Sequence, residues 1–186
     1  MVQGVAPVRR IVVGDGEPKI PVIFSDGPSP DVRGDPARPG FGMTRIWVTE
    51  DTPAPVKGVR ETLHLPHTLE PPVDGSVCRF VTIPPDRTWL ATINEDRVRA
   101  FFKAMGSPDA CRYASDAPHP YMQETDTLDY VYVLDGSVTL VLDTEEVDLK
   151  EGDTVIQRGA RHAWSNRGDR PCRLVISSHY GSRDRE

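Results

Sequence analysis

One segment of the chain predicts two adjoining β-strands by itself: Leu128-Asp-Tyr-Val-Tyr-Val-Leu134-Asp135-Gly136-Ser137-Val-Thr-Leu-Val-Leu142. Residues 128–134 and 137–142 are rich in β-branched and aromatic side chains, which strands favour. Asp-Gly is a preferred sequence for the type I′ turn that joins two antiparallel strands. We therefore expect a tight hairpin with its turn at Asp135 and Gly136.

Both faces of the first of these strands carry bulky side chains. Successive side chains point to opposite sides of a strand, so Asp129 and Val131 face one way while Tyr130 and Tyr132 face the other. A strand with one solvated face would alternate apolar with polar residues instead. We expect cover on both sides, supplied by an N-terminal arm, a partner subunit or both, and we predict a homodimer.

The rest of the chain also predicts β-structure. It contains 18 Pro and 15 Gly, most of them between short strand-like runs, as in a protein with many turns. Further turns are expected at Glu151-Gly152 and at residues 158–161, just before His162. This spacing favours an all-β protein with a closed antiparallel barrel or jelly roll. The expected strands are Arg10–Val13, Pro21–Phe24, Met43–Thr49, Cys78–Ile83, Leu128–Leu134, Ser137–Leu142, Thr154–Gln157 and Cys172–Ser177.

One short helix is expected near residues 95–105. Asn94 can cap its first turn, Glu95 suits the positive end of the helix dipole, and Gly106 can end it. Four apolar residues repeat at helical spacing and form one stripe, which predicts packing against the sheet. They are Val98, Phe101, Phe102 and Met105.

We divide the chain into three parts. Residues 1–90 contain two proline-rich stretches, 25–42 and 51–75, and are expected to form a β/loop arm packed on the barrel rather than an independent domain. Residues 91–118 hold the helix and a connector. Residues 119–181 are expected to form the barrel core.

Composition excludes several classes of partner. The formal net charge is -6 and the arginines are interleaved with acids, so nucleic acid is not expected as a partner. No run of about 20 apolar residues is present, so no membrane span is expected. The cysteines, Cys78, Cys111 and Cys172, are odd in number and lack metal-site spacing, which is typical of reduced thiols in a cytoplasmic protein.

Residues 119–180 resemble the cupin superfamily, in particular small single-cupin proteins. The resemblance rests on three motifs: Thr125-x-x-x-Asp129-Tyr130-x-x-x-Leu134-x-Gly136, Glu151-Gly152-Asp153-x-Val155-x-Gln157-Arg158-Gly159, and His162-x-Trp164-x-Asn166. Gly159, His162 and Asn166 have the spacing of the family's second motif, in which Gln157 replaces a Pro. The resemblance implies a double-stranded β-helix, or jelly-roll, barrel around a central cavity.

The resemblance also implies where a metal would bind. Metal-dependent cupins use two His and a Glu from the first motif and a His from the second. Here Asp129 falls at the Glu position, Gln123 and Thr125 fall near the two His positions, and His162 takes the last one. Tight Zn, Fe or Mn sites need about three strong ligands. We therefore expect no cofactor, or only a loosely bound divalent metal (Mn, Fe, Ni or Zn) at His162, Asp129 and Gln123.

The same residues suggest acid–base chemistry on a small molecule. His162 and Asp129 are expected to face one cavity as the catalytic pair, because a His beside a carboxylate can move a proton near neutral pH. They could instead form only a satisfied buried pair. Four further residues, Gln123, Thr125, Trp164 and Tyr121, are expected to bind the substrate.

Three functions remain open at this point. The first is a lyase or isomerase that dehydrates, isomerises or decarboxylates a small carbonyl-containing metabolite. The second is a metal-dependent cupin dioxygenase or decarboxylase. The third is a non-catalytic cupin that binds a small ligand. The fold alone does not choose among them, because cupins host many chemistries.

Overall fold

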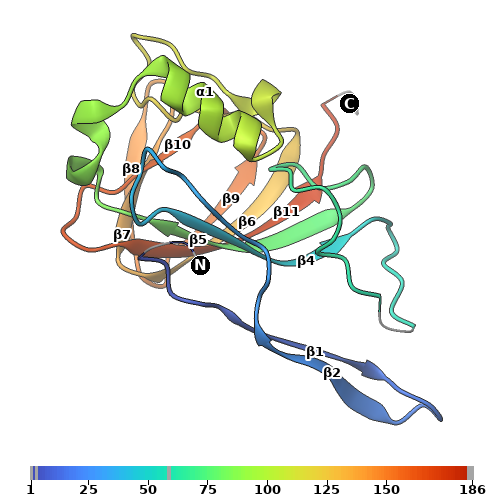
Figure 1. The fold of residues 1–186 in the computed structure, drawn as a ribbon. Helices are drawn as coiled ribbons and strands as arrows, with labels where there is room; N and C mark the ends of the chain where they lie inside the picture. Colours follow the sequence, from blue (N-terminus) through green and yellow to red (C-terminus); the bar gives the residue numbers. More distant parts are fainter. Residues whose placement is uncertain (1, 3, 58–59, 184–186) are drawn as a thin grey trace.

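A computed structural model describes residues 2, 4–57 and 60–183 of the chain. It confirms an all-β protein with a cupin barrel and one α-helix, α1 (Glu95–Ala104) (Figure 1). The strands are β1 (Arg9–Asp15), β2 (Pro21–Pro28), β3 (Val32–Gly34), β4 (Gly42–Thr49), β5 (Ser76–Ile83), β6 (Thr127–Asp135), β7 (Ser137–Val141), β8 (Glu146–Lys150), β9 (Thr154–Arg158), β10 (Ala163–Ser165) and β11 (Cys172–Tyr180). Short 3-10 turns lie at Asp86–Thr88, Leu90–Thr92 and Pro108–Ala110.

Two antiparallel sheets form the barrel. The larger has the order β3-β4-β5-β11-β6-β9, and the smaller has the order β10-β7-β8. The last strand, β11, lies between β5 and β6, so strands distant in sequence close the larger sheet. The larger sheet thus also uses β4 and β5, which precede residues 119–181. The division of the chain at residue 90 remains a prediction.

The predicted hairpin at Asp135-Gly136 is wrong. Strands β6 and β7 belong to different sheets: β6 pairs with β11 and β9, whereas β7 pairs with β10 and β8. Gly136 has a φ of 83° and would place a Cβ atom 2.9 Å from the carbonyl oxygen of Pro171. The two residues therefore make a sharp corner between the sheets, because both edges of β6 are already occupied.

Side chains along β6 alternate between the barrel interior and its outer face. In β6, Asp129, Val131 and Val133 are buried, whereas Tyr132 and Leu134 point outward and are exposed. The largest cluster of buried apolar residues includes members of both sheets and of α1. Packing the inner face of a sheet against a second layer is what stabilises such a strand.

The helix α1 begins and packs as its sequence predicts. The side chain of Asn94 accepts a hydrogen bond from the Arg97 amide at 3.0 Å. Gly106 follows the helix with a φ of 74°, and a Cβ there would lie 2.0 Å from the His67 carbonyl oxygen. The predicted stripe, Val98, Phe101, Phe102 and Met105, is buried. Figure 1 shows α1 lying across the inner side of the larger sheet.

The strands β1 and β2 form a separate two-stranded sheet. Figure 1 shows this hairpin projecting from the body on the side opposite α1. Its apolar side chains are exposed: Ile11, Val13, Val22, Ile23 and Phe24. Among the described residues, no helix has the length and apolar character needed to cross a membrane.

Candidate functional site

A small cavity of about 50 Å³ lies inside the barrel, between the larger sheet and α1. This barrel cavity has mostly apolar and aromatic walls, with Arg38 and Gln123 as polar members. It includes three of the predicted site residues, Tyr121, Gln123 and Trp164. A mostly apolar pocket with a few polar groups favours a small ligand that forms hydrogen bonds with those groups.

Gln123 and His162 are held side by side by their backbones. The Gln123 amide donates to the His162 carbonyl at 2.8 Å, and the His162 amide donates to the Gln123 carbonyl at 2.9 Å. This isolated antiparallel bridge also brings their side chains into contact, with Gln123 Nε2 3.1 Å from His162 Nε2. Gln123 lines the barrel cavity, whereas His162 contacts Gln123 and is not itself a lining residue.

The contacts of His162 determine its tautomer. His162 Nδ1 lies 2.8 Å from the carbonyl oxygen of Ala160, which can only accept, so Nδ1 carries the proton. The lone pair is then on Nε2 and accepts from the Gln123 amide group. Burial lowers the pKa of His162, although the Ala160 carbonyl and the charge of Asp129 oppose this shift. His162 is therefore a neutral imidazole with a basic Nε2 at neutral pH.

Asp129 lies in the same interior but does not orient His162. It is buried on the inner face of β6, and its Oδ1 has no hydrogen-bond partner among the described residues. The Ala160 carbonyl, rather than Asp129, holds Nδ1 of His162. Asp129 acts on His162 through its charge, and it also supports the charge of the buried Arg79.

Tyr121 is built into a buried charged cluster at the wall of the barrel cavity. Its hydroxyl donates to Asp35 Oδ2 at 2.7 Å, and Arg38 Nε donates to the same oxygen at 2.7 Å. The Arg38 guanidinium lies 3.5 Å from the centre of the Tyr121 ring and 4.0 Å from that of Phe41. Burial lowers the pKa of Arg38, while Asp35 and Tyr121 oppose the shift.

The remaining two predicted residues are placed differently. Trp164, in β10, lines the barrel cavity with its ring 5.7 Å from that of His162, and its Nε1 is buried without a partner among the described residues. Thr125 lies in another hollow, with Glu124 and Arg183. Its hydroxyl pairs with that of Thr127 at 2.8 Å. The structure thus brings Trp164 to His162 but not Thr125.

Two buried arginines, Arg79 and Arg38, were not predicted as site residues. Arg79 is flanked at period two by Val77 and Val81, so its inward position was visible in the strand pattern. Arg38 lies in an irregular loop, and no local pattern indicated that it reaches the barrel cavity. One of its nitrogens, Nη2, is buried without a partner among the described residues.

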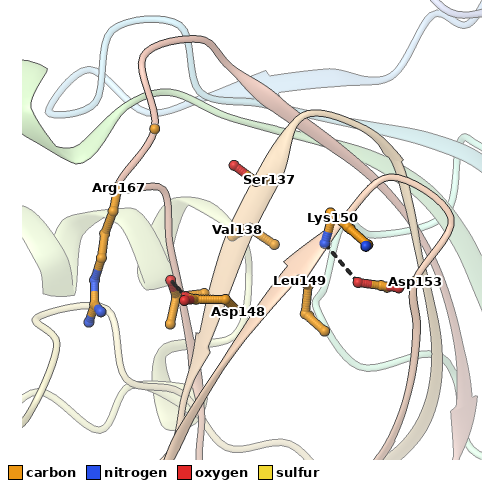
Figure 2. A pocket seen from close by; sticks show the side chains of 9 residues that line it. Ser137, Val138, Asp148, Leu149, Lys150, Asp153 and Arg167 are labelled. Carbon is orange, nitrogen blue, oxygen red and sulfur yellow. Dashed lines mark hydrogen bonds between the residues drawn. The ribbon is translucent and has the colours of Figure 1, made fainter.

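Neither member of the predicted catalytic pair, His162 and Asp129, is among the residues that line the barrel cavity or the other hollows of the described chain. The widest hollow near the smaller sheet, about 540 Å³, lies beside β7 and β8 and is shown in Figure 2. There the Lys150 amide donates to Asp153 at 2.9 Å, and Thr139 donates to Asp148 at 2.6 Å. Arg167, which also lines this groove, pairs with Glu146 of β8.

The cupin metal position offers few strong ligands in this chain. The His162 Nε2 lone pair is directed at the Gln123 amide, and no hydrogen bond joins Asp129 to His162. No group of three His, Cys, Asp or Glu side chains gathers as ligands anywhere in residues 4–57 and 60–183. A divalent ion would find one imidazole and one carboxylate, fewer than the three strong ligands of stable sites.

The family comparison agrees with this architecture. Residues 112–178 match the family model described as Cupin domain. The chain therefore contains a cupin domain.

Two fungal proteins are similar to the chain. It is 31% identical over 137 residues to phomopsin biosynthesis cluster protein D of Diaporthe leptostromiformis, covering 69% of this chain and 65% of that protein. It is 51% identical over 47 residues to phomopsin biosynthesis cluster protein C' of the same fungus, covering 25% of each. The chain thus spans less than two thirds of the length of each fungal protein.

Among solved structures, a putative ethanolamine utilization protein Q from Salmonella typhimurium is 10% identical, with a TM-score of 0.47 over 96% of this chain and all of that one.

Proposed function

We propose that this cupin domain is a lyase or isomerase that removes a proton next to a carbonyl group of a small metabolite. The observation that carries the proposal is the tautomer of His162, whose only basic atom, Nε2, is directed at Gln123 on the wall of the barrel cavity. A general base must be unprotonated and within reach of the proton that it abstracts. Membership of a biosynthesis cluster, given in the names of the fungal relatives, supports a small-molecule role.

Three residues divide the work in this proposal. Gln123 contacts Nε2 through its side-chain amide, and rotation of this amide lets the substrate approach the base while the amide holds a substrate oxygen. His162 takes the proton. Asp129 stabilises the imidazolium that results, because its charge acts on His162 from within the same low-dielectric interior.

The test is proton exchange in D₂O. The protein is incubated with a panel of small 2-oxo and 3-hydroxy carbonyl compounds, and loss of the α-proton signal is followed by NMR. We expect exchange catalysed by the wild-type protein and a loss of about 10²-fold or more in His162→Gln, as for removal of a general base. The matched control is His64→Gln, the same change at an exposed histidine.

The pH dependence follows from the same state of His162. Its pKa is lowered from the ordinary value of 6.5 by burial, so the base is already deprotonated at neutral pH. The exchange rate should therefore be level above pH 6.5 and fall as the pH drops through the lowered pKa. A rate that is unchanged in His162→Gln, or that depends on an added divalent metal and disappears with a chelator, contradicts the proposal.

A further inference from the structure

Two residues that line the barrel cavity each carry a buried hydrogen-bond donor that has no acceptor among the described residues. The donors are Arg38 Nη2 and Trp164 Nε1. A buried donor without an acceptor is costly, so such groups usually have a partner, whether from the protein, from water or from a ligand. Both residues line one cavity of about 50 Å³.

The charge balance of the site indicates which group this is. The Arg38 guanidinium already has a carboxylate partner, because its Nε donates to Asp35 at 2.7 Å. A resting ligand therefore need not bring a full negative charge to neutralise Arg38. The unpaired donors fit a neutral carbonyl oxygen that gains negative charge only during the reaction, as in oxyanion holes.

We infer that Arg38 Nη2 and Trp164 Nε1 form an oxyanion-binding pair for the carbonyl oxygen of the substrate. This inference rests on the proposed function and specifies its substrate as a compound with a carbonyl beside an acidic C–H bond. That C–H bond breaks, its proton moves to His162 Nε2, and its electron pair forms the carbon–carbon double bond of an enolate. The carbonyl π electrons move to the oxygen, where the two N–H groups donate to the developing charge.

The apolar walls support the same arrangement. Phe101 and Phe102 of α1 line the cavity and are almost completely buried, so little water reaches its donors. Donors held in a dry, rigid site stabilise a developing charge more than they would in water. The stacking of Arg38 on Tyr121 and Phe41 holds the guanidinium in place before the substrate arrives.

The test compares a neutral probe with an anionic mimic of the enolate. The probes are 2-nitropropane and its conjugate base, propane-2-nitronate, with binding to the full chain measured by titration calorimetry. We expect the nitronate to bind about tenfold more tightly or better. Trp164→Phe keeps a ring but removes the N–H, and should weaken nitronate binding about tenfold or more while leaving nitropropane binding little changed.

Two further variants complete this test. Trp47→Phe, the same change on the outer side of β4, is the matched control and should bind the nitronate like the wild type. Equal affinity for both probes, or no effect of Trp164→Phe, overturns the oxyanion pair. Nitronate binding needs no proton transfer, so His162→Gln should retain it. A protein that binds nitronate tightly but exchanges no proton would contradict the proposed function and leave this inference standing.

A second, independent inference concerns the exposed hairpin β1–β2. Val13 and Ile23 are register partners and are 67% and 64% exposed. An isolated two-stranded hairpin is at best marginally stable in water, so a hairpin with such apolar side chains calls for cover. No other sheet pairs with β1 or β2 among the described residues.

The outer face of the larger sheet has the matching character. Tyr132 on β6 and Ile156 on β9 point away from the barrel and are 45% and 56% exposed. Leu134, on the same face of β6, is also exposed. The hairpin projects on the side of the body away from α1, which is the outer side of this sheet (Figure 1).

We propose that the hairpin of one copy of the chain docks on this outer sheet face of a second copy. In a two-fold dimer, the hairpin of each copy lies on the outer sheet face of the other copy. The dimer then has two equivalent hairpin–sheet contacts, because each chain carries both surfaces. The hairpin strands have seven and eight residues, about 25 Å in length, and one face of the pair covers about 250 Å². Two such contacts bury about 1,000 Å² in total, the minimum expected for a specific interface.

The test is the mass of the protein in solution, measured by light scattering during size-exclusion chromatography. We expect twice the chain mass of 20.6 kDa. Val13→Asp on the hairpin and Ile156→Asp on the sheet face should each produce monomers. Val56→Asp, at an apolar residue that is exposed in a loop elsewhere, is the matched control and should stay dimeric. A monomeric wild type, or variants that all stay dimeric with unchanged circular dichroism, overturns the proposal.

Discussion

The barrel interior and the β1–β2 hairpin use the same kinds of residue under opposite conditions. Both contain β-branched and aromatic strand residues, and both contain an Arg–Asp pair with a 2.7 Å contact, Arg38–Asp35 inside and Arg9–Asp26 outside. The inner pair is almost fully buried, whereas the outer pair is solvated. Strand propensity explains why both regions form strands. How much each ion pair contributes to the free energy of unfolding depends on whether other parts of the protein shield it from water.

The largest expected effect comes from unbalancing the inner pair. Asp35→Asn leaves the Arg38 guanidinium buried without its carboxylate, and removing one partner of a buried pair typically destabilises a protein by about 3–5 kcal/mol. Urea unfolding should show this loss as a lower midpoint with an unchanged slope. A change below about 1 kcal/mol would mean that the interior is as solvated as the hairpin.

A smaller effect is expected from pH. Burial and nearby Arg38 lower the pKa of His119 to about 3, so the folded state binds its proton far less readily than the unfolded state, whose histidine titrates near 6.5. Stability is therefore full above pH 6.5 and falls as the pH drops from there toward 3, by about 2 kcal/mol at pH 5 for this residue. Burial shifts His162 and His67 in the same direction.

The pH effect can be assigned with one variant. His119→Asn retains an acceptor for the Tyr121 amide, which donates to His119 Nδ1 at 3.1 Å, but it does not titrate. Urea unfolding at pH 7 and pH 5 should show a smaller difference in this variant than in the wild type. An equal difference would show that His119 is not the source.

The smallest effect is expected on the hairpin. Asp26→Asn breaks an exposed pair with Arg9, and such pairs contribute little because water and salt screen them. The urea midpoint should not change measurably, in contrast to Asp35→Asn. A clear loss of stability would indicate that water does not reach this pair in solution, contrary to its exposure in the single chain.

Much of the secondary structure followed from local sequence. The α1 helix, its Asn94 cap and the eight expected strands are all present. Strands β3, β8 and β10 were missed because β3 and β10 have only three residues and β8 is mostly polar. The hairpin at Asp135-Gly136 was wrong because a sharp turn in the sequence does not specify whether the chain returns to the same sheet or crosses to another.

The candidate site was only partly visible. Gln123, His162 and Trp164 were named from their motif positions, and the structure brings them into contact. Thr125 lies apart, and Arg38 was missed because the loop that carries it has no period that predicts direction. The roles of these residues, the absence of a resident metal and the dimer remain predictions.

By itself, the sequence determined the β-rich architecture and the helix, because propensity, turn chemistry and periodicity act between near neighbours in the chain. The resemblance of its motifs to those of cupins indicated the barrel. Only the tertiary structure decided which sheet each strand joins, which nitrogen of His162 carries the proton, and which donors in the cavity lack a partner. Those features depend on contacts between distant segments and on burial. Local sequence does not encode either one.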